Sequence, residues 1–218
     1  LERVAMTLQS ASSIYDTDLF APIMEILNGV SPSGDLRSKR IVADHIRSAV
    51  FIISDGVTPS NTDRGYVLRR LIRRGARFGK DLGLTDEHYK KLIAVIVEKY
   101  GKIYSSVLQN TEMIGNEFLG EAKKFRETLE KGIKQFEKVA GNFSGQQGGK
   151  ISGGEAFTLF TTYGFPLDLT ADLAKERGLI VDTKGFEEEF KKHQELSRAG
   201  AEHKFKGGLA DTSDKVIQ

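Results

Sequence analysis

The sequence predicts a mostly α-helical protein, an irregular multi-helix bundle with one long helix and at most a short extended segment. Apolar residues recur at spacings of three and four along most of the 218 residues, as on one face of a helix. Alternating apolar and polar runs, which are typical of half-buried strands, are scarce. Asp, Ser and Thr precede several periodic segments and Gly follows them, as at helix ends.

Five helices are expected in the first hundred residues. Asp16 or Thr17 can cap the second helix, and Gly29 ends it. Ser60 and Asp63 have the spacing of a capping box, with Asp in place of Glu, at the start of the fourth helix. The expected ranges are 1–8, 17–27, 38–54, a segment that runs from this capping box to about residue 80, and 86–100.

One long helix is expected over residues 103–139, about 55 Å long if unbroken. Its Gly115, Gly120 and Gly132 could bend or interrupt it. The Gly-rich stretch 142–154 lacks the Lys-Ser or Lys-Thr ending of a phosphate-binding loop, so it predicts a turn or a mobile connection. The remaining expected elements are a short helix at 156–162, a corner at 163–166, a helix that Asp168 or Thr170 begins and Gly178 ends, a short extended segment at 179–181, and a helix from Asp182 or Thr183 to about residue 199.

Composition excludes several classes of site. The chain has no Cys, so it has no disulfide, thiol nucleophile or Cys-ligated metal. It has four scattered His residues without the i,i+4 spacing of a helical zinc site: His45, His88, His193 and His203. No membrane span or signal-peptide pattern is predicted, and we therefore expect a cytoplasmic protein. The first residue is Leu rather than Met, which suggests a piece of something longer.

Charge is distributed unevenly, although the net charge is only +2. Residues 36–80 contain eleven basic and three acidic residues, a net charge of +8, which leaves −6 for the rest of the chain. Such asymmetry favours a polyanionic partner, nucleic acid or phosphate. A solvated helix face is the alternative, but such faces usually mix both signs, and no acid occurs between Arg64 and Lys80.

The helix within this basic segment divides into two faces at about 100° per residue. The apolar face contains Val67, Leu68, Leu71, Ile72, Gly75 and Phe78. The opposite face contains Tyr66, Arg69, Arg70, Arg73, Arg74 and Arg77. We expect the first face to be buried and the second to present guanidinium groups.

Three stretches carry motifs in a specific order and spacing. They are Leu-Glu-Arg at 1–3, the segment 44–74 with Pro-Ser-Asn at 59–61 and Arg-Gly-Tyr-Val-Leu-Arg-Arg at 64–70, and Thr-Tyr-Gly-Phe-Pro-Leu-Asp-Leu-Thr at 162–170 followed by Gly-Phe-Glu at 185–187. The first resembles the start of motif 3 in class II aminoacyl-tRNA synthetases. Together the three resemble the alanyl-tRNA synthetase family, and the resemblance covers nearly the whole chain.

The resemblance implies a domain organisation. Residues 1–35 would be the end of a class II catalytic domain with its motif 3 helix, residues 36–200 a helical tRNA-recognition domain, and residues 201–218 a polar linker toward an editing domain. Motifs 1 and 2 and the editing domain's zinc-binding His-x-x-x-His are absent, so we expect this piece to be inactive alone. The full-length ligase would use ATP and Mg²⁺, with Arg3 matching the ligand of the ATP triphosphate, and no cofactor is expected in this piece.

The resemblance also implies binding of the acceptor stem of alanine tRNA, whose identity element is a G·U wobble at the third base pair. The exocyclic amine of the wobble guanine projects into the RNA minor groove, which is wide and shallow. Asn61 matches the family residue assigned to this groove, and its short side chain carries both an acceptor and a donor. From spacing alone, Asn61 could equally be a turn residue or a helix cap.

The second groove-reading residue of the family is an Asp, and this chain has Thr161 in its place. A hydroxyl without a carboxylate loses a charge-assisted acceptor. Asp168 suits helix capping better. Phosphate contacts would come from the basic helix, since arginine forks match phosphate oxygens: Arg64, Arg69, Arg70, Arg73, Arg74 and Arg77. The alternative is that some arginines pair with acidic helices of the same domain, for instance near residues 187–189.

Three functions of different classes compete. The first is an acceptor-stem-binding module of an alanine–tRNA ligase, with no DNA or membrane partner expected. The second is a helical protein-interaction domain with a basic docking face. The third, a free-standing enzyme, has little support because the sequence offers no clustered His, no Cys and no phosphate loop. An affinity for duplex RNA that falls steeply with salt would favour the first.

Overall fold

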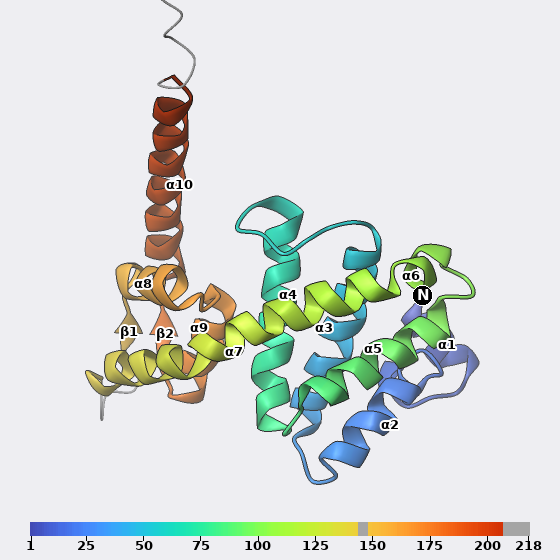
Figure 1. Cartoon of the computed structure of the whole chain (residues 1–218). Helices are drawn as coiled ribbons and strands as arrows, with labels where there is room; N and C mark the ends of the chain where they lie inside the picture. The colour runs from blue at the N-terminus through green and yellow to red at the C-terminus, as the bar shows by residue number, and fades with distance from the viewer. Residues whose placement is uncertain (144–147, 207–218) are drawn as a thin grey trace, which may run out of the picture. The chain divides into compact units, whose positions relative to one another are not determined.

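The computed structural model of the chain describes residues 1–143 and 148–206, with side chains through residue 196. The described part is mostly helical, as predicted, with ten α-helices and two short strands. The chain divides into two compact units, residues 1–131 and the residues from 132 onward. The boundary lies within the long helix α7 (Thr111–Gly141), which therefore belongs to both units (Figure 1).

The first unit is built only of helices in its described residues. They are α1 (Glu2–Leu8), a 3₁₀ turn (Ile14–Asp16), α2 (Ala21–Val30), α3 (Leu36–Ser54), α4 (Asp63–Asp81), α5 (Asp86–Tyr100), α6 (Ser105–Gln109) and the first part of α7. Helices α3 and α4 pack along each other, and α2 lies against α3 and α5 (Figure 1). The apolar positions that step along α7, such as Ile114, Phe118 and Phe125, are fully buried, and each stabilises the fold by about 1.5–3 kcal/mol.

Several predicted helix boundaries in this unit are wrong. Helix α3 begins at Leu36, two residues before its expected start, because Asp35 caps it. The hydroxyl of Thr17 donates to the carbonyl of Ile14 and closes the 3₁₀ turn, so α2 begins four residues later than its expected cap. Gly29 does not end α2, because the amide of Ser31 still donates to the carbonyl of Leu27 at 3.1 Å. The capping box expected at the start of α4 does not form, since Thr62 is the N-cap residue and its side chain makes no capping bond.

The long helix is broken in a place that the sequence did not indicate. Its interruption is at Asn110, between α6 and α7, and not at any of the three glycines. The side-chain amide of Asn110 donates to the carbonyl of Ser54 at the end of α3, at 2.9 Å, and this bond fixes the break. Gly132 serves packing instead, because a Cβ there would lie 2.6 Å from the ring of Phe165.

The second unit combines three further helices with a small parallel sheet. Its elements after α7 are β1 (Lys150–Ile151), α8 (Gly153–Tyr163), α9 (Leu167–Glu176), β2 (Ile180–Val181) and α10 (Thr183–Lys206). Strand β2 confirms the expected extended segment. Its partner β1 lies in the Gly-rich stretch and was not predicted, while residues 144–147 of that stretch lie outside the described part.

The starts of α8 and α9 follow different caps from those expected, whereas α10 begins at Thr183 as predicted. Ser152 and Glu155 form a capping box, so α8 begins earlier than residue 156. The corner before α9 is confirmed, with Gly164 in the left-handed conformation at φ +62°. Pro166 is the N-cap of α9, so Asp168 lies inside the helix and the expected capping role is wrong.

Helix α10 continues past its expected end near residue 199 to Lys206. The rest of the predicted polar linker, residues 207–218, lies outside the described part. The helix is joined to α8 by a cluster of aromatic rings with centroids 5.5–6.4 Å apart: Phe157, Phe160, Phe186, Phe190 and His193. None of the described helices carries an apolar stretch long enough to cross a bilayer.

Candidate nucleic-acid interface

Asn61 is exposed in the loop that connects α3 to α4. Because Thr62 is the cap of α4, the interpretation of Asn61 as a helix cap is wrong. Its side-chain carbonyl accepts a hydrogen bond from the guanidinium of Arg69, two turns along α4. Arg69 also donates to the backbone carbonyl of Pro59 at 3.4 Å. One arginine therefore holds both the side chain of Asn61 and the backbone of its loop.

The backbone of this loop is folded tightly onto the first turn of α4. The amide of Ser60 donates to the carbonyl of Gly65 at 3.1 Å. A Cβ on Gly65 would lie 2.5 Å from the carbonyl oxygen of Thr58, so only glycine fits this approach. Asp63 has φ +51°, in the left-handed region that Asn and Asp adopt more readily than other non-glycine residues.

The arginine face of α4 is less open than the sequence predicts. Arg69 and Arg73 both face the carboxylate of Glu121 on α7, with nitrogen–oxygen distances of 3.3 Å and 2.6 Å. The Glu121 side chain is only 3% exposed and that of Arg73 only 15%. Burial lowers the pKa of Arg73, and the charge of Glu121 opposes this shift. Arg77 is 11% exposed and pairs with Asp81 on its own helix.

Several arginines of the basic segment also lie against an aromatic ring. The guanidinium groups of Arg37, Arg74 and Arg77 lie 5.3–5.8 Å from the ring centroid of Phe78, within the range of cation–π attraction. Many basic side chains of residues 36–80 therefore make their contacts within the first unit. The expectation that these side chains are presented to solvent is wrong for Arg73 and Arg77.

Arg47 belongs to the same basic segment and is also an internal residue. Its guanidinium pairs with Glu2 at 2.6 Å and lies 4.1 Å from the ring centroid of Phe20. The hydrogen bond from Arg47 holds the pKa of Glu2 below its ordinary value. This contact joins α1 to α3, so Arg47 serves the fold and is not available as part of a basic docking face.

Arg64 and Arg70 are the remaining arginines of the predicted set. Arg64 is exposed and Arg70 is half-buried. Neither contacts an acid or an aromatic ring among the side chains that the structure describes. Arg64 lies in the first turn of α4, three residues after Asn61. These two arginines are the members of the predicted set best placed to meet an external phosphate.

Glu121 is the residue of this site that the sequence did not reveal. The alternative that arginines pair within the domain is correct for Arg69 and Arg73, but the carboxylate comes from α7 and not from residues 187–189. One signal could have found it. Glu121 follows Phe118 by three residues and precedes Phe125 by four, so an acid occupies an inward position of the apolar pattern.

Thr161 lies in the second unit, on the exposed side of α8. Its hydroxyl donates to the backbone carbonyl of Phe157, one turn earlier, at 2.9 Å. The proton is therefore committed to the helix, and the oxygen can only accept from an outside donor. In this geometry Thr161 can accept from an amine, as the lost carboxylate would, but without its charge.

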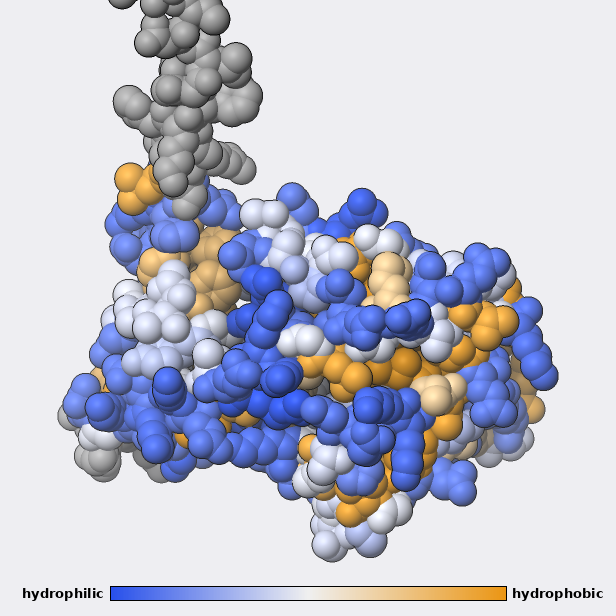
Figure 2. All heavy atoms as spheres, viewed as in Figure 1, coloured by the Kyte–Doolittle hydropathy of each residue, from blue (hydrophilic) through white to orange (hydrophobic). Residues whose placement is uncertain are grey.

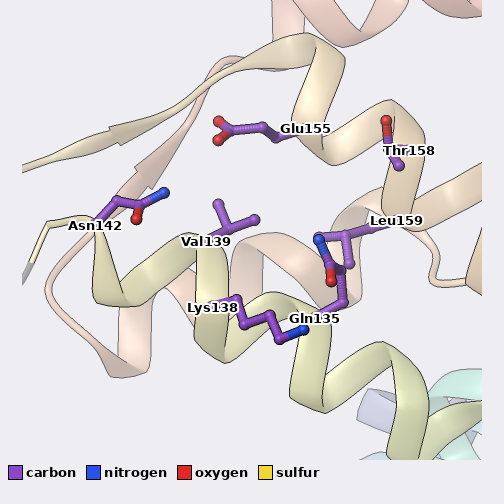
Figure 3. Close-up of a pocket in the computed structure, with 7 residues that line it drawn as sticks. All are labelled: Gln135, Lys138, Val139, Asn142, Glu155, Thr158 and Leu159. Atoms are coloured by element: carbon purple, nitrogen blue, oxygen red, sulfur yellow. The ribbon is translucent and has the colours of Figure 1, made fainter.

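The second unit also has a cavity of 370 Å³ between the last turns of α7 and the first turns of α8 (Figure 3). The residues around it are Gln135, Lys138, Val139, Asn142, Glu155, Thr158 and Leu159. Glu155 is committed to the capping box with Ser152. No group of three or more His, Asp or Glu among the described side chains is placed to hold a metal ion. Arg3 is exposed on α1.

The sequence profile of the family described as tRNA synthetases class II (A) matches residues 1–217. The chain belongs to this class II tRNA synthetase family. The class II membership expected from the three motif stretches is thereby confirmed.

Relatives of this class II family member are alanine–tRNA ligases. The chain is 42% identical to the ligase of Treponema pallidum (strain Nichols) over 222 residues, covering 98% of this chain and 36% of that protein. It is 43% identical to the ligase of Borreliella afzelii (strain PKo), covering 97% of this chain and 36% of that one. The ligase of Xanthomonas euvesicatoria pv. vesicatoria (strain 85-10) is 42% identical, with 99% and 24% covered. The chain therefore spans about a quarter to a third of the length of these curated relatives.

Proposed function

We propose that this chain binds the acceptor stem of alanine tRNA, as the tRNA-recognition part of an alanine–tRNA ligase. The observation that carries the proposal is the placement of Asn61, an exposed amide fixed by Arg69 beside the outward-directed Arg64. A fixed amide can present its donor to the uracil carbonyl and share its acceptor with the guanine amine of a G·U pair. Arginines beside it can hold phosphates, which position RNA without reading its sequence.

The surface chemistry supports RNA over an acidic protein as the partner. Figure 2 shows one face of the molecule on which hydrophilic residues predominate, with apolar residues between them. Most of the arginines that would make a broad basic docking face are engaged internally by Glu121, Asp81 and Phe78. Few exposed arginines therefore remain for a partner. Such a small surface fits a short acceptor stem better than it fits a protein partner with a broad acidic surface.

Thr161 is proposed as the second groove contact. Its hydroxyl oxygen can accept from the guanine amine, because the hydroxyl hydrogen is already donated to the backbone carbonyl of Phe157. The bond is neutral, and neutral hydrogen bonds contribute about 0.5–1.5 kcal/mol where those to charged groups contribute about 1.5–3 kcal/mol. We therefore expect a preference for G·U that is smaller than a carboxylate would give.

ATP and Mg²⁺ belong to the proposed activity of the full-length ligase, which attaches alanine to its tRNA in protein biosynthesis. The described side chains form no group of three or more His, Asp or Glu that could hold Mg²⁺. Arg3 is the residue proposed to meet the ATP triphosphate, through its always-charged guanidinium.

The proposed function is tested by binding of the chain to acceptor-stem hairpins that carry G·U, G·C or A·U at the third pair. Each hairpin is titrated at several salt concentrations, because phosphate contacts make the affinity fall with salt. We expect the G·U hairpin to bind most tightly and all three to show similar salt slopes. Equal affinity for the three hairpins would contradict acceptor-stem recognition, and no binding at low salt would favour the docking domain.

A further inference from the structure

A chain of polar contacts runs from the interior of the first unit to the loop of Asn61. Glu121 on α7 is nearly inaccessible, with its side chain 3% exposed. It accepts from Nε of Arg73 at 2.7 Å and lies 3.3 Å from Nε of Arg69. The terminal nitrogens of Arg69 in turn bond the side chain of Asn61 and the carbonyl of Pro59. The guanidinium of Arg69 thus has the buried carboxylate on one side and the loop on the other.

We propose that Glu121 is a positioning residue for recognition, which acts through Arg69 to hold Asn61 in one orientation. Without an acid behind it, the charged group of Arg69 would have no anion on its buried side. The guanidinium would then bind phosphate or water, and the loop would lose the donor that fixes it. The carboxylate therefore supplies orientation and not contact with RNA, and this inference rests on the proposed function.

The same two helices offer a matched control. Lys80 on α4 pairs with Glu130 on α7 at 3.1 Å, so that contact also joins α4 to α7. The side chains of Lys80 and Glu130 are 44% and 71% exposed, and neither contacts the loop of Asn61 in any described interaction. Glu130→Gln removes an ion pair between the same two helices without touching the contacts of Arg69.

The test compares Glu121→Gln with Glu130→Gln by two measurements. Hydrogen exchange of the RNA-free chain reports the order of residues 57–63, and hairpin titration reports the G·U to G·C affinity ratio. For Glu121→Gln we expect faster exchange in the loop and a ratio reduced by about 2- to 30-fold, the range found for residues that couple to a site without touching the ligand. Glu130→Gln should leave both at the wild-type values.

A second variant tests whether the effect passes through Arg69. In an Arg69→Met background, Glu121→Gln should reduce the ratio no further, because the coupling is already broken. If Glu121→Gln alone does not fold, Arg69→Met breaks the same contacts at a side chain that is 23% exposed, with the same expected changes.

The outcomes separate the two claims. If Glu121→Gln leaves hydrogen exchange in residues 57–63 unchanged, Glu121 does not position the loop, whatever the RNA affinities are. Faster hydrogen exchange with an unchanged G·U to G·C affinity ratio also overturns the positioning role. A further reduction of the ratio in the Arg69→Met background overturns the route through Arg69. A wild-type chain with no preference for G·U contradicts the proposed function, and the recognition role of Glu121 falls with it. The exchange measurement distinguishes that case from a failed contact chain.

Discussion

Arg73 donates from Nε to the carboxylate of Glu121 at 2.7 Å, and the two side chains are only 15% and 3% exposed. An arginine that the sequence places on an outward face is thus part of the packing between α4 and α7. Its removal leaves a buried carboxylate with fewer partners, and unpaired buried charge is costly. This relationship separates the arginines of α4 into those that hold the fold and those that we propose to contact RNA.

Arg73→Ala is expected to act on stability. Loss of one partner from a largely buried ion pair should lower the free energy of unfolding by about 2–4 kcal/mol. Lys80→Ala is the control, because its pair with Glu130 is exposed and should contribute less than about 1 kcal/mol. Chemical denaturation measures both. A variant with wild-type stability but a smaller salt slope for RNA would place Arg73 at the RNA surface instead.

Arg64→Ala and Arg70→Ala are expected to act on RNA affinity and not on stability. Each should reduce the salt slope by up to about 1, equally for G·U and G·C hairpins, if a phosphate contact is lost. Lys90→Ala on α5 removes another exposed cation and serves as the control. Titration at three salt concentrations gives the slopes. Slopes that stay at the wild-type value in both variants would exclude these two arginines from the interface.

Gly65→Ala should disturb the loop of Asn61 directly. The new Cβ would meet the carbonyl of Thr58 at 2.5 Å, and the backbone must move to accept it. We expect the free energy of unfolding, measured by thermal unfolding, to fall by about 1–3 kcal/mol, as for overpacked sites. Gly115→Ala on α7 is the control, since a Cβ there meets nothing within 4 Å and should be neutral or stabilising by up to about 1 kcal/mol. Equal stability of the two variants would show that the loop backbone moves to accommodate the new Cβ at little cost.

The helical class and most helices were predictable, because apolar spacing of three and four follows from burying one helix face. The burial of Leu68, Ile72 and Phe78 on α4 is confirmed. The exposure of Val67, at 41%, is not what that pattern predicts. The break between α6 and α7 depended on a tertiary bond, that of Asn110 to Ser54, which no local pattern contains. The start of α8 follows a local capping box of Ser152 and Glu155 that the prediction missed.

The candidate site was predictable in part, because the apolar spacing along α4 also separates its arginines onto the opposite face. A helical wheel separates arginines from apolar residues, but it does not show which arginines another helix will cover. Arg73 and Arg77 were placed correctly on the polar face, yet α7 supplies an acid for Arg73 and α4 itself supplies Asp81 for Arg77. Two patterns in the sequence carried a hint of this arrangement: Glu121 at an inward position of α7, and the i,i+4 spacing of Arg77 and Asp81 on α4.

Thr161→Asp should increase the preference for G·U while total affinity falls. A carboxylate would accept from the guanine amine about 1 kcal/mol more strongly than a hydroxyl, but it would also repel nearby phosphates. Thr162→Asp is the control, since it adds the same charge to the neighbouring exposed position of α8. Both hairpins are titrated at one salt concentration. If Thr161→Asp and Thr162→Asp change the ratio alike, Thr161 does not face the groove.

Asn61 is proposed to read the third base pair, and the variant Asn61→Ala tests this role. The measurement is the ratio of affinities for G·U and G·C hairpins, with Asn116→Ala as a control that removes an exposed amide from α7. Loss of a groove-reading amide should cost about 1–3 kcal/mol of discrimination, by analogy with base readout in DNA. We expect the ratio to fall toward 1 in Asn61→Ala and to stay at the wild-type value in Asn116→Ala. A wild-type ratio in Asn61→Ala would show that Asn61 does not read this base pair.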